Sequence, residues 1–157
     1  MTSLPASNPP LAWHRRPEYW SATLALVGTA IAGYLTLVHF RESLLVCSGV
    51  SDCETVQTSQ YAEILGIPVA LLGLLCFVIL LGLAVVRVIQ PERADTITMV
   101  MFVMVVASIG FYIYLTYLEL FVINAVCQWC VASSLVMLGM LITETMLLRR
   151  VLSIPEE

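Results

Sequence analysis

The sequence predicts an all-α integral membrane protein, a four-helix bundle in up-down antiparallel order with an outward loop between helices 1 and 2. Three observations predict this fold class. Of the 157 residues, 60% are hydrophobic and 11% are charged, whereas soluble domains are about 45–50% apolar and about 25% charged. The apolar residues form four runs, each long enough to cross a bilayer core as a helix. Short connections between the later runs favour antiparallel neighbours.

The four runs divide the chain into a membrane domain with a tail at each end. Residues 1–18 are polar and rich in proline, and we expect a cytoplasmic N-terminal tail there. Residues 19–150 form the four-transmembrane-helix domain, with spans expected at 19–40, 67–88, 96–120 and 127–148. Residues 151–157 form a cytoplasmic C-terminal tail. Small residues would let the helices approach closely; they are Gly28, Ala32, Gly33, Gly73, Gly82 and Gly110.

The arginines predict the orientation of the bundle. We expect the charges to lie in the loops, and the chain has no lysine. One side of the four-helix arrangement carries Arg15, Arg16, Arg87, Arg93, Arg149 and Arg150, and the other side carries only Arg41. The positive-inside rule makes the arginine-rich side cytoplasmic. The protein is then expected in the plasma (inner) membrane among lipid, with both termini cytoplasmic and the loop of residues 41–66 facing the periplasm or cell exterior. No basic patch indicates nucleic acid.

Cys127 and Cys130 form a Cys-x-x-Cys pair at the start of the fourth span. Their i, i+3 spacing puts both sulfurs on one helix face, close enough for a disulfide. A helix N-terminus also stabilises a thiolate, so this spacing favours a redox pair. An inert disulfide is the plain alternative. A zinc site is disfavoured, and no metal is expected, because zinc usually takes four ligands and only His39 lies at that height.

A second pair, Cys47 and Cys53, lies in the outward loop. Taken alone it could be a structural disulfide, since the cell exterior is oxidising. Two pairs on one membrane face can also pass a disulfide between them. Asp52 and Glu54 should raise the pKa of Cys53 and make it a poorer leaving group, which favours the disulfide on the loop pair. Cys76, in the middle of the second span, is expected to be a small buried apolar residue.

Aromatic residues are frequent in the third span. They are Phe102, Phe111, Tyr112, Tyr114 and Tyr117. Bundle packing explains them most simply, and some of them could instead line a pocket for an aromatic ring.

Short motifs along the chain, taken in order, resemble the vitamin K epoxide reductase family in its bacterial form. The resemblance covers about residues 34–134. Its motifs are Cys47-x5-Cys53, Ser59, Tyr61-Ala62, Gly66-Ile67-Pro68 at the start of the second span, and Cys127-Gln128-Trp129-Cys130 at the start of the fourth. This order separates the chain from the DsbB-type quinone reductases, which place the Cys-x-x-Cys pair in the first outward loop.

The resemblance implies a role for each motif residue. Cys130 would lie beside a membrane quinone, ubiquinone or menaquinone, and pass electrons to it. Cys127 would exchange with Cys53, and Cys47 would be the loop sulfur open to an external dithiol. Ser59 would lie near the quinone; without the family, capping of a short helix is the alternative role for a loop serine.

The resemblance also implies a function, that of a quinone-dependent thiol oxidase that generates disulfides. Many bacterial relatives carry a thioredoxin-like domain after the fourth helix. This sequence ends at Glu157, so the expected partner is a separate thioredoxin-fold (DsbA-like) protein outside the membrane. Animal enzymes have a tyrosine shortly after the second cysteine of the pair, and its absence after Cys130 argues against vitamin K epoxide chemistry specifically. Two alternatives remain: reduction of a quinone or of vitamin K epoxide as the main role, and a structural membrane protein with two stabilising disulfides.

Overall fold

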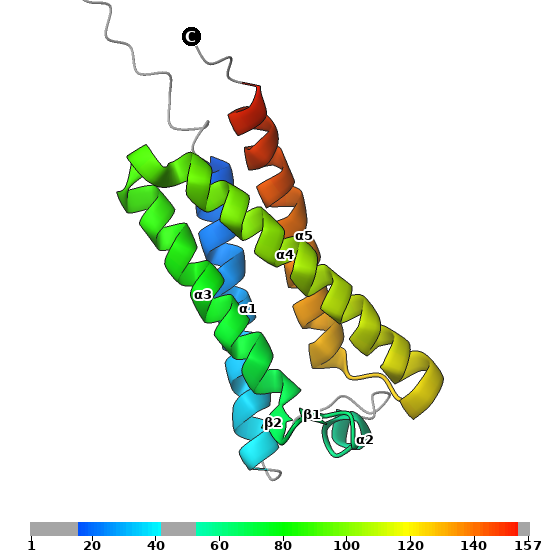
Figure 1. Ribbon diagram of the computed structural model, residues 1–157. Coiled ribbons are helices and arrows are strands. Elements are labelled where there is room, and N and C mark those ends of the chain that lie inside the picture. The colour runs from blue at the N-terminus through cyan, green and yellow to red at the C-terminus, as the bar shows by residue number, and fades with distance from the viewer. Residues whose placement is uncertain (1–15, 42–52, 154–157) are drawn as a thin grey trace, which may run out of the picture.

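The computed structural model describes residues 16–41 and 53–153, and most of this chain is helical. The elements in chain order are α1 (Arg16–Phe40), α2 (Cys53–Gln57), β1 (Glu63–Ile64), β2 (Ile67–Pro68), α3 (Val69–Ile89), a 3₁₀ turn (Pro91–Arg93), α4 (Ala94–Tyr117), a π-helical turn (Leu118–Ile123) and α5 (Gln128–Leu152). The start of α1, the α3–α4 turn and the end of α5 lie at one end of the bundle, and α2, the two strands and the α4–α5 link lie at the other (Figure 1).

In the described part of the chain, four helices are long and apolar enough to cross a membrane. They cover Pro17–Phe40, Val69–Ile89, Pro91–Ile123 and Gln128–Leu152. Their order is up-down antiparallel, so the predicted all-α four-helix membrane bundle is confirmed (Figure 1). The first helix begins at Arg16, inside the stretch expected as a tail, because Pro17 fits the first turn of a helix, where its missing N–H costs no hydrogen bond.

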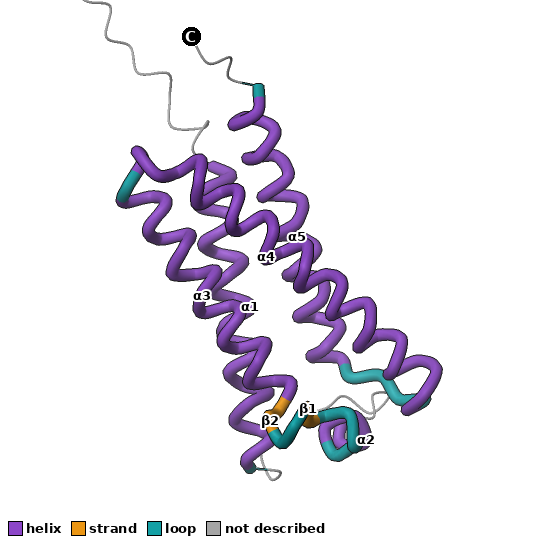
Figure 2. Tube along the Cα trace, in the orientation of Figure 1, coloured by secondary structure: helices purple, strands orange, loops and turns teal. Residues whose placement is uncertain are grey.

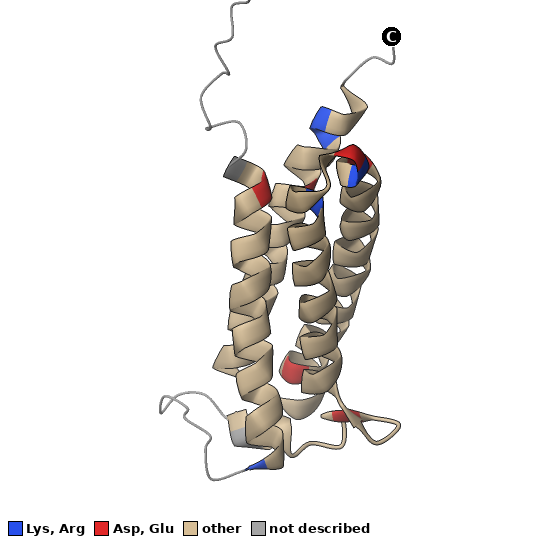
Figure 3. Ribbon diagram, turned by 90° about the vertical axis from the view of Figure 1, so that its left-hand side faces the viewer, with Lys and Arg blue, Asp and Glu red and all other residues tan. Residues whose placement is uncertain are grey.

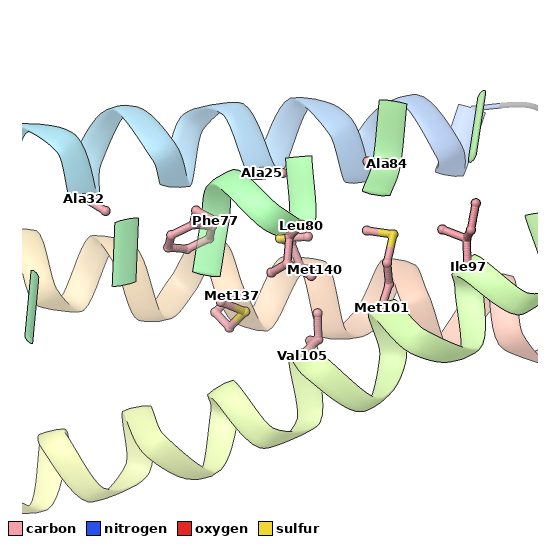
Figure 4. Packing of buried hydrophobic residues seen from close by; sticks show 10 residues of the cluster. All are labelled: Ala25, Ala32, Phe77, Leu80, Ala84, Ile97, Met101, Val105, Met137 and Met140. Carbon is pink, nitrogen blue, oxygen red and sulfur yellow. The ribbon is translucent and has the colours of Figure 1, made fainter. Parts of the chain in front are cut away.

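The helices pack around a core of aliphatic, methionine and phenylalanine side chains (Figure 4). Helix α1 packs against α3 and α5, and α4 packs against α5. At Gly28 of α1 a Cβ atom would overlap the buried ring of Phe77, so this glycine permits the close approach of α1 and α3. Gly73, Gly82 and Gly110 were also expected to let helices approach closely. That prediction is wrong, because a Cβ at these positions would meet nothing within 4 Å. Those three positions do not lie at helix contacts.

Arg87, which was counted among the charges of the cytoplasmic side, is buried in the last turn of α3. Charged residues gather towards the two ends of the bundle (Figure 3), but Arg87 of α3 is 2% exposed and pairs with the fully buried Glu144 of α5. Their closest nitrogen and oxygen atoms, Nη1 and Oε2, are 2.7 Å apart. The hydroxyl of Ser21 in α1 also donates to Glu144, and Arg87 Nη1 donates to Thr98 Oγ1 of α4 at 3.4 Å. The expectation that charges lie only in loops was wrong here because a carboxylate on another helix compensates the arginine.

A short segment closes the end of the bundle opposite this ion pair. Strands β1 and β2 form a two-stranded antiparallel hairpin beside α2 (Figure 2). Its two-residue turn has positive φ at both Leu65 (55°) and Gly66 (79°), which is the geometry of tight hairpin turns. The Val69 N–H donates to the Ala62 carbonyl at 2.9 Å and the Ala62 N–H donates to the Ser59 carbonyl at 2.9 Å. These bonds tie residues 59–62 to the start of α3.

Candidate active site: a dithiol beside an apolar cavity

Cys127 and Cys130 lie at the first turn of α5 as free thiols. Cys127 has extended backbone angles (φ −94°, ψ 116°) and occupies the cap position that precedes the helix. Its carbonyl accepts the Val131 N–H at 3.1 Å, so the first turn of α5 starts at this residue. The Cys127 sulfur also hydrogen-bonds the Cys130 thiol. The two sulfurs therefore have the proximity that the i, i+3 spacing predicts.

The Cys127 thiol is the more acidic of the pair. The hydrogen bond from the Cys130 thiol lowers the pKa of Cys127 to about 7, although burial opposes the change. Backbone N–H groups of Cys130 and Trp129 at the start of α5 lower the same pKa further, and the nearby Glu119 carboxylate raises it. The site thus stabilises a thiolate at neutral pH, as a helix N-terminus does.

Cys53 of α2 and Cys127 share one buried cluster with Leu35 of α1. Their exposed fractions are 1% and 0%. Cys53 is disulfide-bonded, whereas Cys127 is a free thiol. The loop cysteine and the α5 pair, about 70 residues apart in sequence, are therefore packed in one cluster. Cys47 and Asp52 lie outside the described residues, and so does the side chain of Glu54.

An apolar cavity of about 420 Å³ lies at the same end of the bundle. Its walls come from α1, the 56–62 segment, α3, α4, the π-helical turn and α5. Cys130 lines it together with Ser59, whereas Cys127 and Cys53 lie outside its walls. The Ser59 hydroxyl donates to the Val56 carbonyl at 2.8 Å, at the end of α2. The serine is thus both part of the wall and bonded to the last turn of a short helix.

Two aromatic residues of α4 line the cavity, Phe111 and Tyr112. Tyr112 also hydrogen-bonds Ser133 of α5. Tyr114 and Tyr117 are half-exposed on the outside of the bundle, where Tyr117 stacks on Phe121 at a ring-centroid distance of 5.1 Å. The aromatic residues of the third span are therefore divided between the cavity wall and the outer surface.

Cys76 lies in the cavity wall, 3.3 Å from the Ser108 hydroxyl oxygen. It is partly buried and carries a free thiol. Cys76 was expected to be a small buried apolar residue, whereas in the structure it is partly buried and lines the cavity.

Glu119 belongs to the site, although its position in the sequence suggested only an outward loop charge. The π-helical turn carries it into the cavity wall, where it is 7% exposed. Its carboxylate hydrogen-bonds the Cys130 thiol and the Cys127 N–H. The signal that could have found it is that Glu119 is the only charged residue between positions 96 and 123, because charged residues inside a membrane span usually serve function.

The cavity has the properties of a site for a flat, mainly apolar ring. Ligand pockets measure roughly 300–1,000 Å³ and combine apolar walls with a few polar groups, and this cavity matches both criteria. Among the described residues, no cluster of three His, Cys, Asp or Glu side chains could hold a metal ion. A dithiol with one sulfur in the wall of such a cavity can deliver electrons to a bound ring. The sequence over residues 19–145 matches the family model described as the vitamin K epoxide reductase family.

Proposed function

The chain belongs to the vitamin K epoxide reductase family, and on that premise we propose that it is a thiol oxidase that passes electrons from an external dithiol to a membrane quinone. The family makes the chain a membrane oxidoreductase with a quinone-linked redox role. Electrons pass from the external dithiol to Cys47 and Cys53, and then to Cys127 and Cys130. The electron donor is a thioredoxin-fold (DsbA-like) dithiol protein outside the membrane.

One observation carries this proposal. The Cys127–Cys130 pair touches two different surroundings, because Cys127 packs with Cys53 while Cys130 lines the apolar cavity. A pair in this position can exchange with the loop disulfide on one side and face a bound ring on the other.

In the proposed cycle, a thiolate of the partner attacks Cys47 and breaks the Cys47–Cys53 disulfide. The second partner thiol resolves the mixed disulfide, which leaves the partner oxidised and the loop pair reduced. Cys53 then attacks Cys127 of the oxidised Cys127–Cys130 pair and releases Cys130 as a thiolate. Cys47 resolves the Cys53–Cys127 bond and restores the loop disulfide.

The residues that would hold the quinone are those of the cavity wall, with Ser59 and Tyr112 as hydroxyl groups near Cys130. When bound, a quinone supplies an acceptor for two electrons and two protons. The chain supplies the position of the Cys130 sulfur and a cavity with few polar groups. Ubiquinone and menaquinone both fit this description.

The proposed location is the plasma (inner) membrane, with the cavity end facing the periplasm or the cell exterior. Arg93, Arg149 and Arg150 lie at the end of the bundle opposite the cavity, which supports a cytoplasmic position for that end. Arg87 no longer contributes to this argument because it is buried in an ion pair. Arg15 lies outside the described residues.

The test compares quinol formation by the purified protein in detergent with two electron donors. The donors are a reduced thioredoxin-fold dithiol protein and dithiothreitol, a small dithiol that can reach the α5 pair directly. We expect Cys53→Ala to lose turnover with the protein donor and to keep a part of it with dithiothreitol. We expect Cys130→Ala to lose turnover with both donors, since no sulfur then faces the cavity.

Either of two results would contradict the proposal. Turnover of Cys130→Ala at the wild-type rate would remove this sulfur from the route. The second result is that wild-type protein forms no quinol from ubiquinone or menaquinone while all four cysteines stay in disulfide bonds. This result would favour the structural alternative.

A further inference from the structure

Glu119 is a buried carboxylate in direct contact with the dithiol. It shares the single proton of the Cys130 thiol with the Cys127 sulfur, and it accepts a hydrogen bond from the Cys127 N–H. Its carbonyl accepts the Ala125 N–H at 3.1 Å, which fixes the turn that follows α4. The carboxylate is therefore held at the first turn of α5 by backbone bonds on its own element and by two groups on the neighbouring one.

The cavity wall offers this carboxylate no cation. The residues that line the cavity include no Lys, Arg or His; apart from Glu119, their titratable groups are Tyr61, Cys76, Tyr112 and Cys130. A buried carboxylate without a cation is costly, and such residues in membrane proteins mark functional sites. The contact of Glu119 with the Cys130 thiol indicates that its role concerns the proton of this thiol.

Oxidation of a dithiol releases two protons as well as two electrons. At Cys127 and Cys130 both protons must leave sulfur atoms that are buried or face an apolar cavity. Tyrosine hydroxyls titrate at about 10 and are poor carriers, whereas a carboxylate can accept and return a proton near neutral pH when its surroundings are apolar. Glu119 is the only carboxyl group among the cavity-lining residues.

We propose that Glu119 is a catalytic residue that takes the proton from Cys130 Sγ and passes it to an oxygen of the bound electron acceptor. The inference rests on the proposed function. As the Cys127–Cys130 bond forms, both S–H bonds break, and two electrons and two protons go to the quinone. Glu119 carries one of these protons and ends the step ionised, as it began. The second proton leaves Cys127, whose low pKa already favours its release.

The first experiment follows a single turnover of fully reduced protein mixed with quinone. We expect Glu119→Gln to slow quinol formation by about 10²–10⁴-fold, the usual contribution of a positioned acid or base. Glu119→Asp keeps the carboxyl group and is expected to recover part of the rate. Formate added to Glu119→Ala is also expected to restore part of the rate. Glu63→Gln is the matched control, because Glu63 lies in β1, pairs with His39 at 3.3 Å and is not in the cavity wall.

Two readouts do not depend on quinone. In reduced protein, the infrared S–H stretching band of Cys130, assigned with Cys130→Ala, is expected to shift in Glu119→Gln and to stay unchanged in Glu63→Gln. Disulfide exchange between the dithiol partner and the Cys47–Cys53 pair is expected to be unchanged in Glu119→Gln, because that step uses other sulfurs.

The outcomes separate the two proposals. Quinol formation by wild type and by Glu119→Gln at rates within twofold of each other would overturn the role of Glu119 and leave the thiol oxidase standing. The role would also be overturned by a second pattern of results. In that pattern Glu119→Gln forms quinol slowly, formate does not restore the rate of Glu119→Ala, and the S–H band of Cys130 does not shift in Glu119→Gln. Absence of quinol from wild type would overturn the proposed function and this inference with it.

Discussion

At the scale of single residues, the largest cause of the acidity of Cys127 is the hydrogen bond from the Cys130 thiol. Because the pKa of Cys127 is lowered to about 7, its thiolate should dominate above that pH and be lost below it. We therefore expect labelling of reduced Cys127 by a small uncharged thiol reagent to reach half its maximal rate near pH 7, against about 8.5 for an ordinary cysteine. Mass spectrometry of the Cys127 peptide across pH measures this midpoint.

Two variants isolate the donor. Cys130→Ala removes it, and the midpoint should move upwards towards the ordinary value. Cys130→Ser keeps an O–H donor at nearly the same place and should hold the midpoint low. Equal midpoints in the two variants would show that the helix N-terminus, not the Cys130 side chain, sets the acidity of Cys127.

At the scale of elements, the contact of α1 with α3 depends on Gly28. A methyl group there would overlap the fully buried Phe77 ring, and overpacking of this kind costs about 1–3 kcal/mol. Gly28→Ala is expected to lower the free energy of unfolding in detergent by that amount. Gly82→Ala is the control, since a Cβ there meets nothing within 4 Å. A stability of Gly28→Ala equal to that of Gly82→Ala would contradict the packing of α1 on α3.

At the scale of the whole molecule, one buried ion pair joins all four membrane helices. Arg87 and Glu144 come from α3 and α5, and the hydroxyls of Ser21 and Thr98 add α1 and α4. Removing one partner of a buried pair costs about 3–5 kcal/mol because the other charge is left uncompensated. Arg87→Met and Glu144→Met should each destabilise the bundle by that amount. The double variant should be more stable than either, and Arg149→Gln, at an exposed position, should change stability little.

A denaturation series in detergent on these four proteins measures the coupling. Additive losses in the double variant would mean that Arg87 and Glu144 do not interact in the folded bundle.

The large-scale organisation could be predicted from the sequence, because long apolar runs have few solutions in a bilayer. All four spans were located within a few residues of their observed ends. The contact between α3 and α5 through Arg87 and Glu144 could not be predicted from the sequence. The sequence of one helix does not indicate which neighbouring helix carries the compensating charge. The same limit applied to the role of Glu119, which depends on the π-helical turn that directs it to Cys130.

The sequence predicted the cysteines of the candidate site but not the cavity beside them. The positions of Cys53, Cys127 and Cys130 agree with a relay, because Cys53 and Cys127 share one cluster and Cys130 lines the cavity. The cavity itself could not be predicted, since its wall combines side chains from four helices and the 56–62 segment. The spacing of residues along one helix does not predict a cavity between several helices. The roles of Cys47, Cys53, Cys127 and Cys130 in the relay stay predictions.

The Arg87–Glu144 pair also has a consequence for biogenesis. During synthesis Arg87 emerges 57 residues before its partner, so α3 inserts before the carboxylate that pairs with Arg87 has been made. The most hydrophobic of the four spans is this one, with a mean hydropathy of 3.1 against 1.7–2.2 for the others, which lets it insert despite the charge. We expect a nascent chain truncated after Val126 to insert α3 and yet remain open to proteases until α5 arrives. A truncated chain as protease-resistant as the full-length protein would refute this order of assembly.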